Sequence, residues 1–253
     1  MRTFLKQWWQ ILVVGSVLTS IMGVSLFTFA NDPIKVNIAF TTFLLFLLFL
    51  GWRVQRTFNQ VLGKTYLHGY ETLSTFVRYS TSDGNIIQYE TFRHIQNKTL
   101  VRDYIEHQFH WTGSIPPKIS SCLQELGEIQ PVEGTAKSKI RVNFRKPTLF
   151  NEVEVVHLRM EIDDSDHKSE TCVGLLVGEP IKVITFKIEL LHSKMKYSGT
   201  YAKILRGDID KNNVNPPTEI ASVKFDTVSK SFEYILANPK PGYRYSLEWD
   251  RKS

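Results

Sequence analysis

The sequence is poor in cysteine, and this limits its redox and metal chemistry. Only Cys122 and Cys172 occur among the 253 residues, at a spacing that fits neither a disulfide framework nor a cysteine-based zinc site. Reduced thiols in the cytosol are the simplest interpretation. The chain also lacks a phosphate-binding loop, a GxSxG elbow, an HExxH pair and a CxxC pair. We therefore expect no catalytic residues, no metal and no cofactor, and we do not expect an enzyme.

A strong excess of charge is also missing. The formal net charge is +6, with 22% charged residues. This excess is mild and does not by itself indicate a nucleic-acid-binding protein. The mean hydropathy of −0.17 argues against a membrane protein with many spans. The apolar residues are instead concentrated at the beginning of the chain.

Two long apolar runs stand there. Residues 8–30 contain no Asp, Glu, Lys or Arg, and residues 36–52 form a second uncharged run. A helix that crosses a bilayer needs about 20 apolar residues. We therefore expect a hairpin of two transmembrane helices within residues 1–52 and a helical linker over residues 53–69. A signal peptide is the competing interpretation of the first run, but its apolar stretch is long for one.

The charges that flank the two runs predict the orientation of the hairpin. Arg2 and Lys6 precede the first run, and Arg53, Arg56 and Lys64 follow the second. Positively charged flanks stay on the cytoplasmic side of a membrane. We therefore expect a two-pass protein with both termini in the cytoplasm.

Small residues recur at every fourth position of the first run, at Gly15, Thr19 and Gly23. In lipid, this spacing lets two helices approach closely. The face they form would pack either against the second run of the same chain or against another protomer in a homo-oligomer. The sequence leaves both alternatives open.

The pattern changes to alternation of apolar and polar residues over residues 70–253, as the segment VVHLRMEI illustrates. This period of two is typical of half-buried antiparallel strands. The pair Asp83-Gly84 predicts a hairpin turn, and residues 120–129 are the one short helix candidate. We expect an all-β sandwich or barrel of about ten strands, with two sheets divided near residues 133–134.

Basic residues follow one another in the next segment of the chain. Strand alternation would place Lys137, Lys139, Arg141 and Arg145 on one face. A solvated strand face is one interpretation. The other is a site for an anion, with Lys139, Arg141 and Arg145 binding a nucleotide, a nucleic acid or a lipid headgroup.

One segment, GDIDKNNVNPPTE, resembles part of a calcium-binding loop. Asp208, Asp210 and Asn212 alternate, and Glu219 stands at the twelfth position, as oxygen ligands for calcium would. However, Asn213 replaces the glycine of such loops, and strands rather than helices are expected on both sides. We therefore interpret this segment as a turn between strands, and the segment DDSDH in the same way.

The order of these parts resembles the two-transmembrane effectors of bacterial abortive-infection systems. Some of these are associated with retrons, and others respond to cyclic oligonucleotides. The resemblance is one of architecture, two apolar runs followed by a strand-rich part, and it extends over the chain without a diagnostic motif. It implies a protein of the bacterial inner membrane that defends the cell against phage.

On this resemblance the β-rich part would sense an anionic trigger, a nucleotide or nucleic acid, or a partner protein of the defence system. The protein would then oligomerise and disrupt the lipid bilayer. The alternative is a membrane-tethered binding or sensor module with a cytosolic β domain and no toxic activity.

Overall fold

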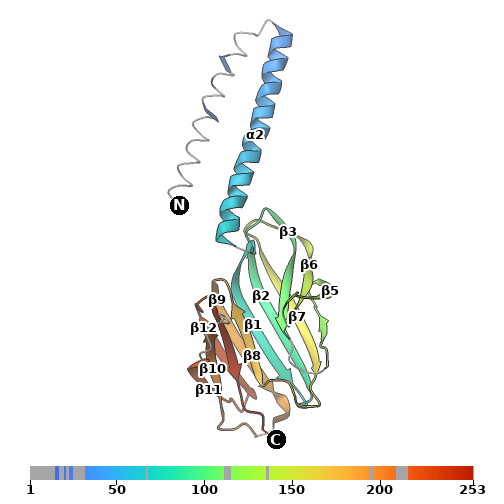
Figure 1. Cartoon of the computed structure of the whole chain (residues 1–253), viewed down its shortest axis with the longest axis vertical. Coiled ribbons are helices and arrows are strands. Elements are labelled where there is room, and N and C mark those ends of the chain that lie inside the picture. The colour runs from blue at the N-terminus through green and yellow to red at the C-terminus, as the bar shows by residue number, and fades with distance from the viewer. Residues whose placement is uncertain are drawn as a thin grey trace. The chain divides into compact units, whose positions relative to one another are not determined.

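The computed structural model of the chain divides into two units, Met1–Thr65 and Tyr66–Ser253. The first unit contains the long helix α2, and the second unit consists of β-strands (Figure 1). The residues that the structure describes are 15, 16, 20, 23, 24, 32–66, 68–110, 115–134, 137–193, 196–208 and 216–252.

Helix α2 (Pro33–Thr65) has 33 residues. It begins at a proline, which has no N–H to leave unpaired in the first turn. The side chain of Asp32 caps it and accepts hydrogen bonds from the backbone N–H groups of Ile34 at 3.2 Å and Lys35 at 3.3 Å. The apolar part of α2 is exposed in the structure, and its mean hydropathy reaches 2.0. These properties make α2 compatible with association with a membrane.

The predicted hairpin of two transmembrane helices is wrong. In the described part of the chain, one helix, Pro33–Lys64, is long and apolar enough to cross a membrane. The helix that contains the second apolar run continues past Trp52 to Thr65, within the stretch expected to be a helical linker, because the polar residues that follow include no proline. Most of the first run, residues 8–30, lies outside the described residues.

The small residues of the first run are described only in part. Gly15 and Gly23 are helical, and Thr19 lies outside the described residues. A Cβ atom added at Gly15 would lie 4.0 Å from Cδ1 of Leu50, whereas one added at Gly23 would meet nothing within 4 Å. Gly15 therefore lies near α2 of the same chain, and self-association through this face stays a prediction.

In its described residues, the second unit contains strands and one short 3₁₀ helix, η1 (Leu191–Ser193). The strands are β1 (Tyr70–Thr81), β2 (Ile86–Asn97), β3 (Val101–His110), β4 (Lys118–Ser120), β5 (Glu125–Pro131), β6 (Lys137–Leu149), β7 (Val153–Asp163), β8 (Cys172–Val177), β9 (Ile181–Leu190), β10 (Tyr201–Asp208), β11 (Thr218–Lys224), β12 (Ser231–Ala237) and β13 (Tyr243–Glu248).

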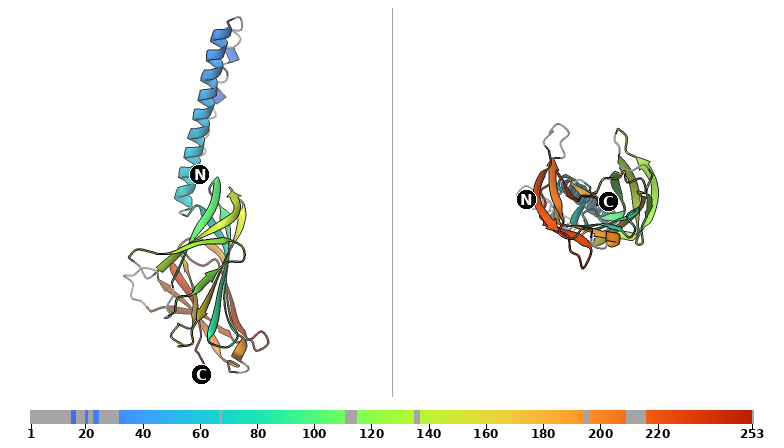
Figure 2. Two further views of the ribbon diagram at one scale, coloured as in Figure 1. Left: turned by 90° about the vertical axis from the view of Figure 1, so that its right-hand side faces the viewer. Right: turned by 90° about the horizontal axis from the view of Figure 1, so that it is seen from below.

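These strands form three sheets. The largest has six strands in the order β12-β9-β1-β2-β7-β4, a second has the order β11-β10-β13-β8, and a third has the order β3-β6-β5. All pairs are antiparallel except β1 with β9. Seen from below, the orange-to-red strands of the four-stranded sheet and the green strands of the three-stranded sheet lie on opposite sides (Figure 2). The predicted hairpin at Asp83-Gly84 is confirmed, since β1 and β2 pair on either side of it.

Two hydrophobic cores lie on one face of the six-stranded sheet. The first packs this sheet against the four-stranded sheet and includes Phe186 and Leu247, both fully buried. The second packs it against the three-stranded sheet and includes Ile95 and Val142. Strand β2 contributes Ile87 to the first core and Ile95 to the second. Because these two residues are separated by an even number of positions, both cores occupy the same face.

The predicted sandwich or barrel of about ten strands is also wrong, because the described residues form thirteen strands in three sheets. Alternation along a strand shows which face is buried but does not show which sheet covers it. The helix candidate at residues 120–129 contains instead the last residue of β4 and most of β5. Glu133 and Gly134 lie between β5 and β6, which pair with each other.

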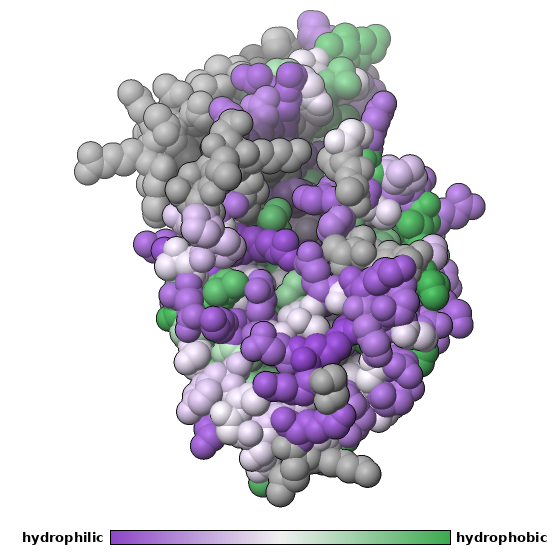
Figure 3. All heavy atoms as spheres, turned by 60° about the horizontal axis from the view of Figure 1, so that its bottom comes forward, coloured by the Kyte–Doolittle hydropathy of each residue, from purple (hydrophilic) through white to green (hydrophobic). Residues whose placement is uncertain are grey.

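One face of the β domain is rich in polar side chains. The face turned toward the viewer in Figure 3 is largely hydrophilic, with apolar residues scattered in small spots. Single exposed apolar residues are normal on a folded domain and need no functional explanation.

Candidate functional site

A hollow of about 280 Å³ lies on the three-stranded sheet. Its residues come from all three strands of this sheet, and most of their side chains are polar or charged. They are Tyr104 and Glu106 of β3, Gly127, Glu128 and Gln130 of β5, and Lys139 and Arg141 of β6. Its volume lies just below the range usual for ligand sites, and the charged groups that meet in it make the hollow the candidate binding site.

Strand alternation directs the two basic side chains into the hollow. Ile140 and Val142 of β6 are buried in the second core, and therefore Lys139 and Arg141 face outward. A register shift in β5 between Leu126 and Ile129 bends the neighbouring strand. Within this bulge, a Cβ atom added at Gly127 would lie 3.2 Å from the Cβ of Arg141. The glycine therefore leaves room for the arginine.

Arg141 is held in place by an aromatic ring. Its guanidinium carbon lies 3.7 Å from the centre of the Tyr104 ring, a close cation–π contact. Arg141 forms no ion pair with a carboxylate in the described part of the chain. Its planar fork of N–H groups is thus oriented and free to bind an anion in bidentate geometry.

Lys139 is already engaged. Its Nζ lies 3.2 Å from Oε1 and 3.4 Å from Oε2 of Glu106 on the neighbouring strand. Glu128 adds a second carboxylate to the hollow. The two carboxylates offset the two basic groups, so the hollow has mixed charge. It suits a ligand that carries both an anionic group and hydrogen-bond donors.

The structure separates the three predicted anion-binding residues. Lys139 and Arg141 line the hollow, but Arg145 does not. The guanidinium of Arg145 donates a hydrogen bond to the carbonyl oxygen of Cys122 at 3.3 Å. Sequence reasoning missed Tyr104, Glu106, Glu128 and Gln130, because their contribution depends on which strands flank β6. The sequence could have indicated these residues only if the segments DYIEHQF and KSKIRVNF had been aligned as neighbouring antiparallel strands.

A second polar group, between Cys122 and His157, has the elements of a nucleophile and a base. The Sγ atom of Cys122 lies 3.3 Å from Nδ1 of His157. However, the backbone N–H of Cys122 donates to the same nitrogen at 3.1 Å. If Nδ1 carried a proton, this proton would face the N–H of Cys122, and the two would repel each other. Burial also lowers the pKa of His157. This geometry disfavours proton transfer from the thiol.

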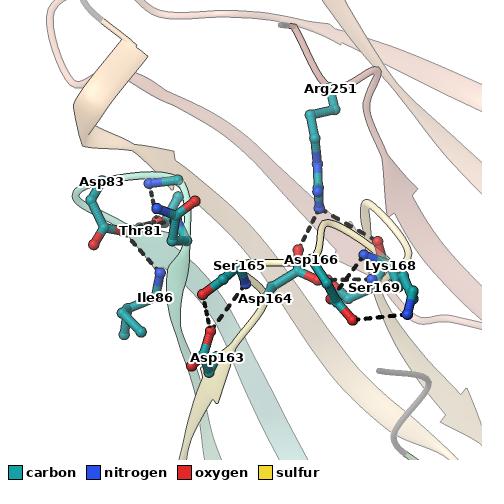
Figure 4. Close-up of polar contacts among 12 residues, drawn as sticks. Thr81, Asp83, Ile86, Asp163, Asp164, Ser165, Asp166, Lys168, Ser169 and Arg251 are labelled. Carbon is teal, nitrogen blue, oxygen red and sulfur yellow. Dashed lines mark hydrogen bonds and ion pairs between the residues drawn. The ribbon is translucent and has the colours of Figure 1, made fainter. Parts of the chain in front are cut away.

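The acidic turn after β7 has a structural role. Asp164 is 1% exposed, and its side chain accepts hydrogen bonds from the backbone N–H of Ser169 at 2.9 Å and from Arg251 at 2.6 Å (Figure 4). Asp163 accepts a hydrogen bond from Ser165, and Asp166 pairs with Lys168. Each carboxylate thus has a partner, as expected of a turn. Within the described residues no group of His, Cys, Asp and Glu side chains is arranged to hold a metal ion.

The segment that resembles a calcium-binding loop, residues 207–219, is described only at its two ends. Asp210 and Asn212 lie outside the described residues, while Asp208 ends β10 and Glu219 belongs to β11. These two strands pair in antiparallel fashion, which agrees with a segment that connects them.

No protein-family model and no curated protein matches the chain. Among solved structures, the chain is similar to an M1 zinc metallopeptidase from Deinococcus radiodurans, with 8% identity over 72% of this chain and 42% of that one and a TM-score of 0.35. For native yeast LTA4 hydrolase the identity is 10%, the coverage 72% and 29%, and the TM-score 0.41. For baculovirus P35 these values are 10%, 74% and 99%, and 0.39.

The chain spans less than half the length of the metallopeptidase and of the hydrolase. At these TM-scores the likeness supports no inference about fold, activity or ligand. The candidate site therefore rests on the geometry of this chain alone.

Proposed function

We propose that this protein is a membrane-anchored binding module. Helix α2 anchors the chain in a bacterial inner membrane, and the hollow on the three-stranded sheet binds a small ligand on the cytoplasmic side. The observation that carries the proposal is Arg141, which is stacked on Tyr104 and unpaired with any carboxylate among the described residues. Basic residues at the carboxyl-terminal end of α2, Arg53, Arg56 and Lys64, favour the cytoplasmic side for the β domain.

The chemistry of the hollow favours a nucleoside monophosphate as the ligand class. A phosphate group matches the bidentate N–H fork of Arg141. Glu128 and Gln130 offer oxygen acceptors for the N–H groups of a base or the hydroxyls of a sugar. The volume of about 280 Å³ suits a small molecule.

The test is to measure the binding of nucleoside monophosphates to the full chain in lipid nanodiscs. Arg141→Gln removes the charge and the fork, so affinity for the nucleotide should fall by roughly tenfold to a hundredfold. Arg206→Gln is the matched control, because Arg206 also stacks on a tyrosine, at 5.0 Å from the centre of the Tyr243 ring, but on a different sheet. Binding that is absent in the unaltered protein, or weakened equally by both variants, would contradict the proposal.

If the protein also has the predicted anti-phage activity, ligand binding would control that activity. A nucleotide in the hollow would be the trigger, and oligomerisation of the chain would then disrupt the bilayer. No comparison connects the chain with abortive infection, so this activity stays a prediction, as does the absence of catalysis. Loss of membrane potential on induction of the protein would support the effector, and harmless localisation would favour the binding module.

A further inference from the structure

Polar residues separate the two hydrophobic cores on the inner face of the six-stranded sheet. Along β2, this face carries Ile87 in the first core and Ile95 in the second. Alternation places Thr91 and Arg93 on the same face between them. On β1, Thr75 is the pairing partner of Arg93. We call Thr75, Thr91 and Arg93 the polar seam, and it lies between the cores that the two smaller sheets cover from opposite sides (Figure 2).

Two polar atoms of this seam have no partner. Thr75 is 1% exposed, and among the described residues nothing forms a hydrogen bond with its hydroxyl oxygen. The Nε atom of Arg93 is also buried and, in the same part of the chain, also without a hydrogen bond. None of the ion pairs between described residues includes Arg93. Buried polar groups in proteins are nearly always paired, so two orphan groups on neighbouring strands require an explanation.

The outer face of the same two strands shows how an arginine is accommodated when the chain itself supplies the counter-charge. Arg78 of β1 donates hydrogen bonds to Glu189 at 2.8 and 2.6 Å and to Glu90 at 3.1 Å. Arg93 instead has a threonine and a valine as its pairing partners on the adjacent strands. A partly buried guanidinium without a counter-charge loses hydration and gains no attraction in return. An anion from outside the chain would stabilise a guanidinium in this position.

The donors of the polar seam suit a small oxyanion. The guanidinium fork of Arg93 matches two oxygens of a carboxylate or a phosphate, and the hydroxyl of Thr75 is a further donor. His107 lies on the inner face of β3, and burial, followed by the charge of Arg93, lowers its pKa to about 3. Its imidazole is therefore neutral at pH 7. Thr75 and Thr91 are at most 7% exposed whereas Arg93 is partly exposed, so a small ion can reach the fork but a protein surface cannot.

We propose that the polar seam binds a small oxyanion, a carboxylate or a phosphate, through Arg93 and Thr75. The site is separate from the hollow, because Lys139 and Arg141 face outward from the three-stranded sheet, whereas Arg93 faces inward between the cores. It depends neither on the nucleotide proposed for the hollow nor on anchoring by α2. Because the ion would bind the folded chain alone, it would stabilise the β domain.

Urea unfolding of the full chain in detergent tests the site, followed by near-UV circular dichroism. Inorganic phosphate and acetate are the two probes, each balanced with sodium chloride to constant ionic strength. Every chain carries Arg141→Gln, so that the hollow cannot account for the result. A bound anion lowers the equilibrium constant of unfolding by the factor 1 + [L]/Kd, about elevenfold at ten times Kd. This effect saturates, whereas the general stabilisation by excluded salts does not.

Three substitutions separate the expected contributions. Arg93→Met keeps the apolar stem and removes the charged fork, so it should abolish the saturating effect. Thr75→Val keeps the shape and removes the hydroxyl, so it should weaken anion binding roughly threefold to tenfold. Arg159→Met is the matched control, because Arg159 lies on the neighbouring strand β7 and faces Glu90 on the outer face at 3.9 Å. It should leave the saturating effect unchanged.

Nuclear magnetic resonance of the chain with ¹³C-labelled histidine gives a second measurement. The anion should shift the ring signals of His107, because it offsets the nearby charge of Arg93. It should leave those of His110 unchanged, since His110 is exposed on the other face of β3.

Saturating stabilisation that survives Arg93→Met would place the anion elsewhere and overturn the proposal. Stabilisation that rises without saturation in every chain would be a general salt effect and would overturn it as well. If Arg93→Met does not fold, the His107 signals decide, and signals that neither probe moves overturn the proposal. A response to only one of the two probes supports the site and identifies the class of oxyanion.

Discussion

His107 is a residue whose surroundings oppose its protonation. It lies on the inner side of β3, between Ile105 and Phe109 on the same face. Loss of hydration, and secondly the charge of Arg93, lower its pKa from 6.5 to about 3. Between these two values the unfolded chain binds more protons than the folded one. The contribution of neutral His107 to the free energy of unfolding is therefore complete above pH 6.5 and decreases as the pH falls toward 3.

We expect the free energy of unfolding of the detergent-solubilised protein to fall by up to about 1.4 kcal/mol per pH unit below pH 6. Urea unfolding at several pH values between 7 and 5 measures this slope. His107→Gln should reduce it, whereas His110→Gln, on the exposed face of the same strand, should not. Some slope should persist, because the pKa of His157 is lowered in the same direction. A slope that His107→Gln leaves unchanged would contradict this assignment.

At the scale of single elements, α2 is the part that the proposed anchoring depends on. Leu45 lies in its apolar stretch and is 61% exposed in the structure. An arginine near the middle of a membrane helix costs about 2.5–3.5 kcal/mol on insertion scales. Leu45→Arg should therefore reduce the fraction of the protein that stays in membranes after alkaline carbonate extraction.

Gln60→Arg is the matched control, since this residue is exposed on α2 beyond the apolar stretch and near residues that are already basic. It should leave the membrane fraction unchanged. If Leu45→Arg is also retained in full, α2 is not the anchor of the chain.

The sequence predicts elements better than it predicts their partners. The alternation in VVHLRMEI correctly predicts strand β7, and Asp83-Gly84 correctly predicts the hairpin of β1 and β2, because both signals are local. Strand β5 was expected as a helix, because its bulge at Gly127 and Glu128 breaks the alternation. The pairing of β5 with β6 was missed for the same reason.

The candidate site could likewise be predicted only in part, because it depends on which strands are neighbours. Lys139 and Arg141 were found from one strand, but the ring of Tyr104 and the carboxylates of Glu106 and Glu128 come from two others. The end of the second apolar run at Trp52 is not the end of its helix, because loss of hydropathy does not break hydrogen bonding within a helix. A span in lipid and the length of its helix are separate properties.

At the scale of the whole β domain, one buried carboxylate connects three distant segments. The backbone N–H of Asp164 donates to the carbonyl oxygen of Asn85 in the β1–β2 turn, at 2.8 Å. Its side chain pairs with Arg251 at 2.6 Å, near the end of the chain. In the same terminal segment, the ring of Trp249 packs edge-on against Tyr79, at 4.8 Å between centroids. These contacts fasten the four-stranded sheet to the six-stranded sheet.

Asp164→Asn should lower the free energy of unfolding by about 2 kcal/mol, because it leaves the arginine of a largely buried pair without its counter-charge. The expected loss is below that of a fully buried pair, since 29% of the Arg251 side chain remains exposed. Lys118→Gln provides the contrast. Its ion pair with Glu161 is 3.7 Å long and the lysine is 87% exposed, so the change should be within about 0.5 kcal/mol.

A double-mutant cycle with Arg251→Gln separates the ion pair from the packing of Trp249. If the pair itself joins the sheets, the double variant should be destabilised by less than the sum of the two single changes. Additive effects would mean that Asp164 acts through its turn alone. In that case Trp249→Ala, which removes the aromatic contact with Tyr79, should be the more damaging change, and the terminal segment would be held by packing rather than by charge.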